Sequence, residues 1–84
     1  MIYYFFSEKQ GIKGLINHRL VKDILCDRKE KAVEYALKNN PGLKEKPVGY
    51  IYSCRQVSGE YLNGAYKTQH PVQITGCEKL EDLV

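Results

Sequence analysis

Residues 48–57 read Val-Gly-Tyr-Ile-Tyr-Ser-Cys-Arg-Gln-Val, and this stretch decides the fold class. Its β-branched and aromatic side chains are typical of a β-strand. Successive side chains of a strand point to opposite faces of the sheet. We therefore expect Tyr50 and Tyr52 to share one face. Ile51 and Arg55 belong to the other face.

The residues that follow indicate further strands joined by tight turns. Ser58-Gly59 and Asn63-Gly64 are both turn signals, and Asn-Gly is the stronger signal for a hairpin. Residues 65–68 and 71–75 are each predicted to be strands, with His70-Pro71 as a break or an edge position between them. The second half of the chain is thus expected to form an antiparallel meander, and residues 78–83 a last short helical turn.

The chain opens with another strand signal. Residues 1–6 read Met-Ile-Tyr-Tyr-Phe-Phe, a short apolar run of aromatic and β-branched side chains. Such a run is typical of a strand that is buried on both faces. We expect it to lie in the centre of the sheet.

Two helices are predicted between these strand regions, the first from about residue 9 to residue 25. Ser7-Glu8-Lys9-Gln10 has the pattern of a capping box at a helix start. Gly11 and Gly14 weaken the first turns of this helix by about 1 kcal/mol each relative to Ala. The apolar residues that follow have helical spacing. They are Ile12, Leu15, Ile16, Leu20, Val21, Ile24 and Leu25.

A second helix is predicted from about residue 28 to residue 39. Asp27 is expected to be its N-cap, and Asn39-Asn40-Pro41-Gly42 is a strong termination signal. Its apolar side consists of Ala32, Val33, Ala36 and Leu37.

The predicted fold class is α+β, with elements in the order strand, helix, helix and three strands. We expect two helices packed on one face of a small, mainly antiparallel sheet of three to four strands. The 84 residues are too few for two cores, so residues 1–84 are expected to form one domain.

Charge and cysteine content narrow the class of protein. The net charge of +3 disfavours a mimic of DNA, and it offers little support for a concentrated phosphate-binding patch. Three cysteines without a C-x-x-C pair do not suggest a secreted disulfide scaffold. No signal peptide or membrane-spanning stretch is recognisable. We therefore expect a cytoplasmic protein that does not bind a membrane.

No pattern of catalytic or metal-binding residues stands out. Structural zinc sites usually present their ligands in close pairs, whereas Cys26, Cys54 and Cys77 are far apart in sequence. Cys54 is next to Arg55, but neighbouring strand residues point to opposite faces, so the cation would not activate the thiol. We predict no catalytic residues, no metal and no cofactor.

One group of residues suggests a binding surface, because it combines strand tyrosines with basic side chains. Three interpretations stay open: a buried core face, a protein-binding surface, or a surface on which bases stack. The candidate partner-binding residues are Tyr50, Tyr52, Arg55, Tyr61, Tyr66 and Lys67.

The leading functional hypothesis is a small, non-catalytic binding protein, an inhibitor or regulator that occupies a surface of a larger protein. Proteins of this size and kind are often encoded by phages or mobile elements. One alternative is a nucleic-acid-binding module that uses the same face together with Lys67 and His70. Another is a protein that binds or sequesters a small nucleotide. An exposed edge strand also allows a homodimer.

Overall fold

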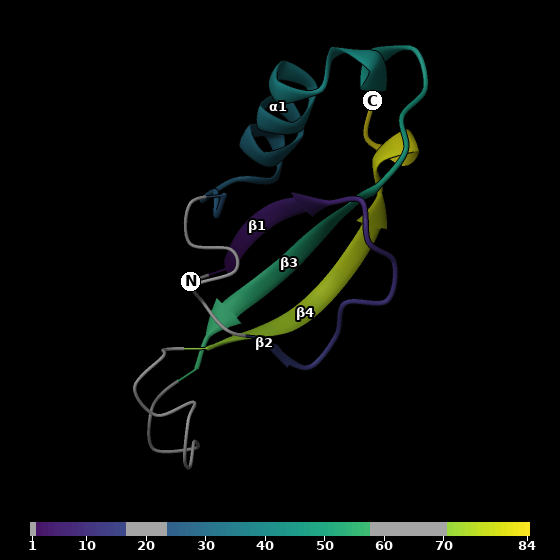
Figure 1. Ribbon diagram of the computed structural model, residues 1–84. Helices are drawn as coiled ribbons and strands as arrows, with labels where there is room; N and C mark the ends of the chain where they lie inside the picture. The colour runs from purple at the N-terminus through teal and green to yellow at the C-terminus, as the bar shows by residue number, and fades with distance from the viewer. Residues whose placement is uncertain (1, 17–23, 58–70) are drawn as a thin grey trace.

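The computed structural model describes residues 2–16, 24–57 and 71–84 (Figure 1). Among these residues there are four strands, one α-helix and two short 3-10 turns. The strands are β1 (Ile2–Ser7), β2 (Leu15–Ile16), β3 (Tyr50–Gln56) and β4 (Val72–Lys79). The helix α1 spans Lys29–Asn39, and the 3-10 turns η2 and η5 span Pro41–Lys44 and Leu80–Asp82.

The four strands form one antiparallel sheet in the order β1-β3-β4-β2. The strand at the start of the chain is therefore confirmed, but its expected central place is wrong because β1 lies at an edge. The inner strands are β3 and β4. In β3, which we call the central strand because it pairs along its length with both β1 and β4, Tyr52 is paired with Phe5 of β1 and with Cys77 of β4. Tyr4 of β1 also forms an isolated antiparallel bridge with Cys26, through two backbone hydrogen bonds.

The α1 helix covers one face of this sheet (Figure 1). It begins at Lys29 after Arg28, which has extended backbone angles and no side-chain cap, so the expected Asp27 cap is wrong. Asp27 instead forms an ion pair with Lys31, four residues later. The predicted apolar stripe does face the sheet. Ala32 and Ala36 are buried against a core made with Leu43, Ile51 and Leu80.

The opposite face carries a second core that contains no helix among the described residues. Phe5, Tyr52, Cys54 and Val72 are its buried members. The rings of Phe5 and Tyr52 are stacked, with their centroids 5.3 Å apart. Partly buried residues from the segments that connect the strands pack against this core. They include Ile12, Ile16, Ile24 and Leu25.

The predicted helix over residues 9–25 is wrong for the described residues, 9–16 and 24–25, which are not helical. Gly11 and Gly14 have φ angles of +81° and +76°, which a right-handed helix does not allow. Ser7 is the last residue of β1, where its hydroxyl accepts a hydrogen bond from the Lys9 backbone amide instead of capping a helix. Leu15 and Ile16 then form the short strand β2 against β4, and residues 17–23 lie outside the described part.

The fold class is corrected accordingly. Within the described residues, the sheet is four-stranded and antiparallel and carries one helix on one face, not two helices. The expected strand at 71–75 corresponds to β4, which extends further, to Lys79. The expected strand at 65–68 and both glycine turns fall within residues 58–70, outside the described part.

A bulge in β4 decides which of its side chains face α1. Ser53 pairs with Gly76 and Cys54 pairs with Ile74, so Thr75 is an extra residue in β4. The extra residue reverses which side chains of β4 face α1: after the bulge, the even-numbered residues face it. Glu78 lies opposite Ile51 on the α1 face, where it forms an ion pair with Lys29. Cys77 and Lys79 lie on the face of Tyr52.

Candidate functional site

The predicted partner-binding residues that the structure describes do not form one exposed surface. Tyr52 is completely buried, so its assignment to a docking surface is wrong. Tyr50 is half-buried at the start of β3, and Arg55 is exposed near the other end of the same strand. These two residues are also on opposite faces of the strand. Tyr61, Tyr66 and Lys67, like His70, lie outside the described residues.

Tyr52 has a structural role that the sequence pattern did not indicate. Its hydroxyl donates a hydrogen bond to the carbonyl oxygen of Lys9 and accepts one from the amide of Ile12, at 2.5 Å and 3.4 Å. Burial raises the pKa of this hydroxyl, so it stays protonated and able to donate. The central strand thereby holds the segment after β1 across the sheet.

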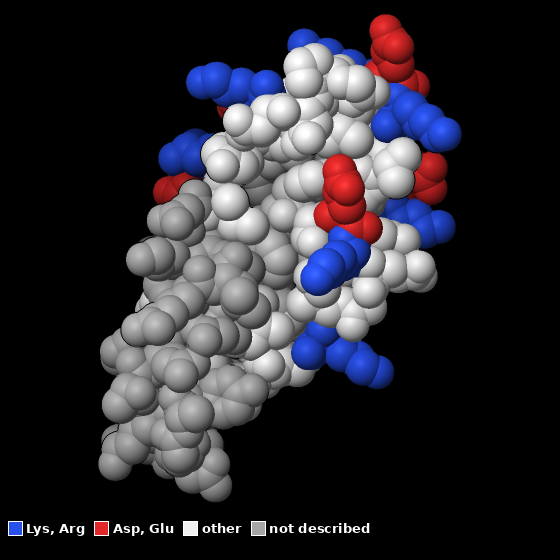
Figure 2. Space-filling model, viewed as in Figure 1, with Lys and Arg blue, Asp and Glu red and all other residues white. Residues whose placement is uncertain are grey.

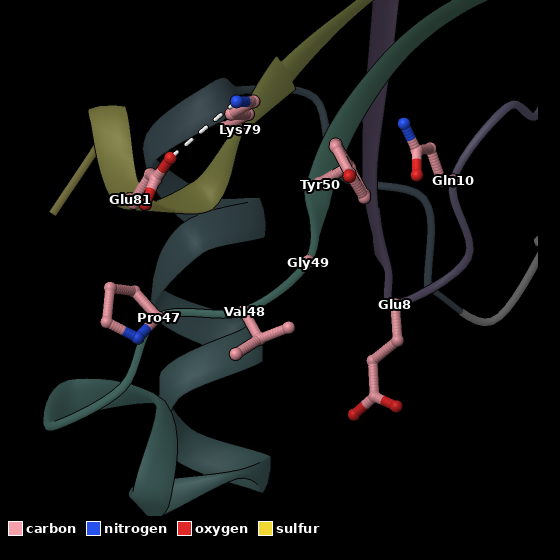
Figure 3. A pocket seen from close by; sticks show the side chains of 8 residues that line it. All are labelled: Glu8, Gln10, Pro47, Val48, Gly49, Tyr50, Lys79 and Glu81. Atoms are coloured by element: carbon pink, nitrogen blue, oxygen red, sulfur yellow. Dashed lines mark ion pairs between the residues drawn. The ribbon is translucent and has the colours of Figure 1, made fainter.

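The tyrosine face has a hollow of about 310 Å³ at the Tyr50 end of the sheet. We call it the Tyr50 hollow. Figure 3 shows Tyr50 between Val48 on one side and Glu8 and Gln10 on the other. The hollow is lined by Glu8, Gln10, Pro47, Val48, Gly49, Tyr50, Lys79 and Glu81.

Three chain segments meet at this hollow, and close packing fixes their positions. Gly49 is buried with a φ of +122°, and the ring of Phe6 lies where a side chain would begin. A Cβ atom at Gly49 would be 2.5 Å from Phe6 Cε1. The amide of Leu80 donates a hydrogen bond to the Gly49 carbonyl, which fixes the end of β4 beside it. The backbone beside the hollow is therefore closely packed and hydrogen-bonded.

The charges around the Tyr50 hollow are mixed, with an excess of carboxylates. Lys79 Nζ lies 3.9 Å from Glu81 Oε1, and Figure 3 marks this ion pair above the opening. Glu8 adds a second carboxylate on the other side. Over the visible described face in Figure 2, blue and red side chains are interspersed and form no single basic patch. Such a surface does not favour a polyphosphate.

The side chains lining the hollow combine an aromatic ring, an exposed apolar residue and polar groups. Val48 is 52% exposed, although it is apolar. A half-buried tyrosine beside an exposed aliphatic residue and a polar rim is typical of a protein contact. Sequence reasoning selected Tyr50 but missed its neighbours. Pro47, Val48 and Glu8 were missed because no pattern indicates that residues 8 and 48 meet.

Two of the three thiols, those of Cys54 and Cys26, are poor candidates for a catalytic nucleophile. Burial raises the pKa of Cys54 to about 11, so its thiol stays protonated near neutral pH. Burial and the neighbouring Asp27 carboxylate also raise the pKa of Cys26. All three cysteines are free. In the described part of the chain, no three His, Cys, Asp or Glu side chains are grouped so as to hold a metal ion.

Comparisons of this chain with models of known families, with curated proteins and with solved structures found no match. Of the helices in the described ranges, none has the length and apolar character needed to cross a bilayer.

Proposed function

We propose that this protein is a small, non-catalytic binding protein that acts by occupying a surface of a partner protein. The Tyr50 hollow is the observation that carries this proposal. It joins a half-buried aromatic ring to an exposed apolar residue beside closely packed backbone, on the face of the sheet opposite α1. Tyrosines in such positions contribute a large share of the affinity in protein complexes.

The proposed docking surface differs from the one expected from sequence. Tyr50 stays, Tyr52 becomes a buried support, and Val48, Glu8 and Gln10 join the surface. Arg55 is exposed at the far end of β3, so it is not part of the hollow. The partner would be inhibited or regulated sterically, because the bound protein covers the surface that it occupies. We also propose that the protein acts in the cytoplasm.

The structure offers less support for a nucleic-acid or nucleotide ligand at this site. The Glu8 and Glu81 carboxylates at the Tyr50 hollow would repel phosphate groups, and Lys79 is already close to Glu81. A nucleic-acid complex would also lose affinity steeply as the salt concentration rises.

Affinity purification from the native host tests the proposal, with the tagged wild-type protein and nuclease-treated and untreated lysates. The expected result is one protein, recovered in stoichiometric amount under both conditions. The exchange Val48→Asp places a charge in the apolar part of the hollow, and should abolish recovery without affecting folding because Val48 is exposed. Recovery that is lost on nuclease treatment would contradict a protein partner.

A further inference from the structure

The outer edge of β4 carries backbone groups that no described strand pairs. β2 covers only the first part of this edge, through Gln73 and Val72. The amide of Ile74 then donates to the carbonyl of Gly14 at 2.9 Å, which is the last hydrogen bond between the two segments. The chain leaves the edge at Gly14, where φ is +76°. Beyond it, Cys77, Glu78 and Lys79 are exposed.

The direction of the free groups follows from the hydrogen bonds that are formed. The amide of Leu80 donates inward to Gly49 of the segment that leads into β3. Backbone groups alternate in direction along a strand. The amide and carbonyl of Glu78 therefore also point toward β3, whereas those of Cys77 and Lys79 point away from it, beside the Tyr50 hollow that Lys79 lines.

We propose that the partner contributes an extended segment, which adds to β4 as an antiparallel strand opposite Cys77–Lys79 and places one side chain in the Tyr50 hollow. This inference rests on the proposed function and specifies the form of the partner. The added strand would continue the line of β2, the strand that already pairs with this edge in antiparallel orientation. In such complexes main-chain hydrogen bonds supply affinity, and pockets beside the edge supply specificity.

A second copy of the chain fits this edge less well. A two-fold pairing that uses the outward groups of both residues must place Cys77 opposite Lys79 of the second copy. Glu78 would then lie opposite the Glu78 of the second copy, and like charges directly opposite each other are destabilising. The occupant is therefore a segment of another protein that has no acidic residue opposite Glu78.

The backbone angles of Lys79 allow a direct test of this edge. Its φ and ψ are −71° and 137°, which proline adopts without strain, and the preceding residue is extended as proline requires. The exchange Lys79→Pro removes the outward amide donor and leaves the inward ladder to β3 intact. Lys79→Ala is the matched control, because it removes the same side chain and keeps the amide.

The probe is a display library of random linear peptides, selected on the wild-type protein. We expect the selected peptides to bind Lys79→Pro about fivefold to tenfold more weakly than Lys79→Ala, since one backbone hydrogen bond is lost. In the wild-type complex, hydrogen exchange at the Cys77 and Lys79 amides should become slower. This second measurement needs no variant, so it holds even where Lys79→Pro folds poorly.

Three results would overturn the inference. The peptides could bind both Lys79 variants equally, with no protection of the Cys77 and Lys79 amides, or selection could yield no peptide that depends on this edge. A dimer in sedimentation velocity that Lys79→Pro abolishes would instead assign the edge to a second copy. A partner that is recovered by wild-type protein and lost with Val48→Asp would still support the proposed function in each case.

Discussion

The Tyr52 hydroxyl donates a hydrogen bond to the Lys9 carbonyl oxygen, 43 residues away in the sequence. This contact ties the segment after β1 to the central strand. It also sets the positions of Glu8 and Gln10, which line the Tyr50 hollow. Buried Tyr52 thus supports the hollow that half-buried Tyr50 helps to form.

The exchange Tyr52→Phe tests this support. It keeps the ring that stacks on Phe5 and removes the hydroxyl, so the Lys9 carbonyl loses its donor. We expect a loss of about 1–2 kcal/mol in the free energy of unfolding, measured by urea denaturation. Tyr50→Phe is the control, and should change stability less because the Tyr50 side chain is only half-buried. Equal stability of Tyr52→Phe and wild type would show that the hydrogen bond contributes nothing.

The exchange Gly49→Ala should be strongly destabilising. The positive φ of Gly49 strains any L-residue with a side chain, and the new Cβ would overlap the Phe6 ring. We expect a loss of more than about 2 kcal/mol, seen as a lower midpoint in thermal or urea unfolding. Gly42→Ala is the control, because a Cβ atom at Gly42 would meet no atom within 4 Å and the φ there is not positive. A midpoint for Gly49→Ala like that of Gly42→Ala would contradict the close packing of Phe6 on Gly49.

Alkaline pH should destabilise the protein through Cys54. Its pKa is raised by burial from an ordinary 9.0 to about 11. Between these values the unfolded chain loses the proton while the folded chain keeps it, so stability falls as the pH rises. The raised pKa of Tyr52 acts in the same direction. Urea midpoints at about pH 8 and about pH 10.5 should differ more in the wild type than in Cys54→Ala. The same difference in both proteins would contradict this assignment.

The Lys29–Glu78 ion pair connects the start of α1 to β4, and its effect should depend on salt. The hydrogen bond to Glu78 raises the pKa of Lys29. The ion pair therefore stabilises the fold below the ordinary pKa of 10.5, and this stabilisation is lost as the pH rises through the raised pKa of Lys29. Because both side chains are partly exposed, the coupling is expected to be small. A double-mutant cycle with Lys29→Ala and Glu78→Ala should give a coupling that decreases with added NaCl. A coupling that is independent of salt would contradict an exposed ion pair.

The sequence predicted the parts of the fold that depend on local pattern. The strand at residues 50–56 and the helix at 29–39 were both expected, because alternation and a four-residue apolar stripe each specify one structure. The prediction of a helix over residues 9–25 was wrong for the described residues because apolar spacing alone does not specify a helix. Ile12, Ile16 and Ile24 do contact the core, but from irregular segments and a two-residue strand. Two glycines with positive φ outweighed the helical spacing.

The candidate site was only partly predictable. Tyr50 and Tyr52 share a face, but nothing in residues 50–56 shows that the segment after β1 crosses over Tyr52 and leaves Tyr50 open. The bulge at Thr75 was equally invisible, since a one-residue shift in register depends on the partner strand. It is this bulge that places Lys79 beside Tyr50 and Glu78 beside Lys29.

The most direct test of the proposed function compares two tyrosines in binding to the purified partner. Tyr50→Ala removes the ring from the hollow, whereas Tyr35→Ala removes a tyrosine that is 43% exposed on α1. The account predicts that the dissociation constant rises at least about tenfold for Tyr50→Ala and stays near the wild-type value for Tyr35→Ala. Unchanged affinity of a folded Tyr50→Ala protein would contradict it.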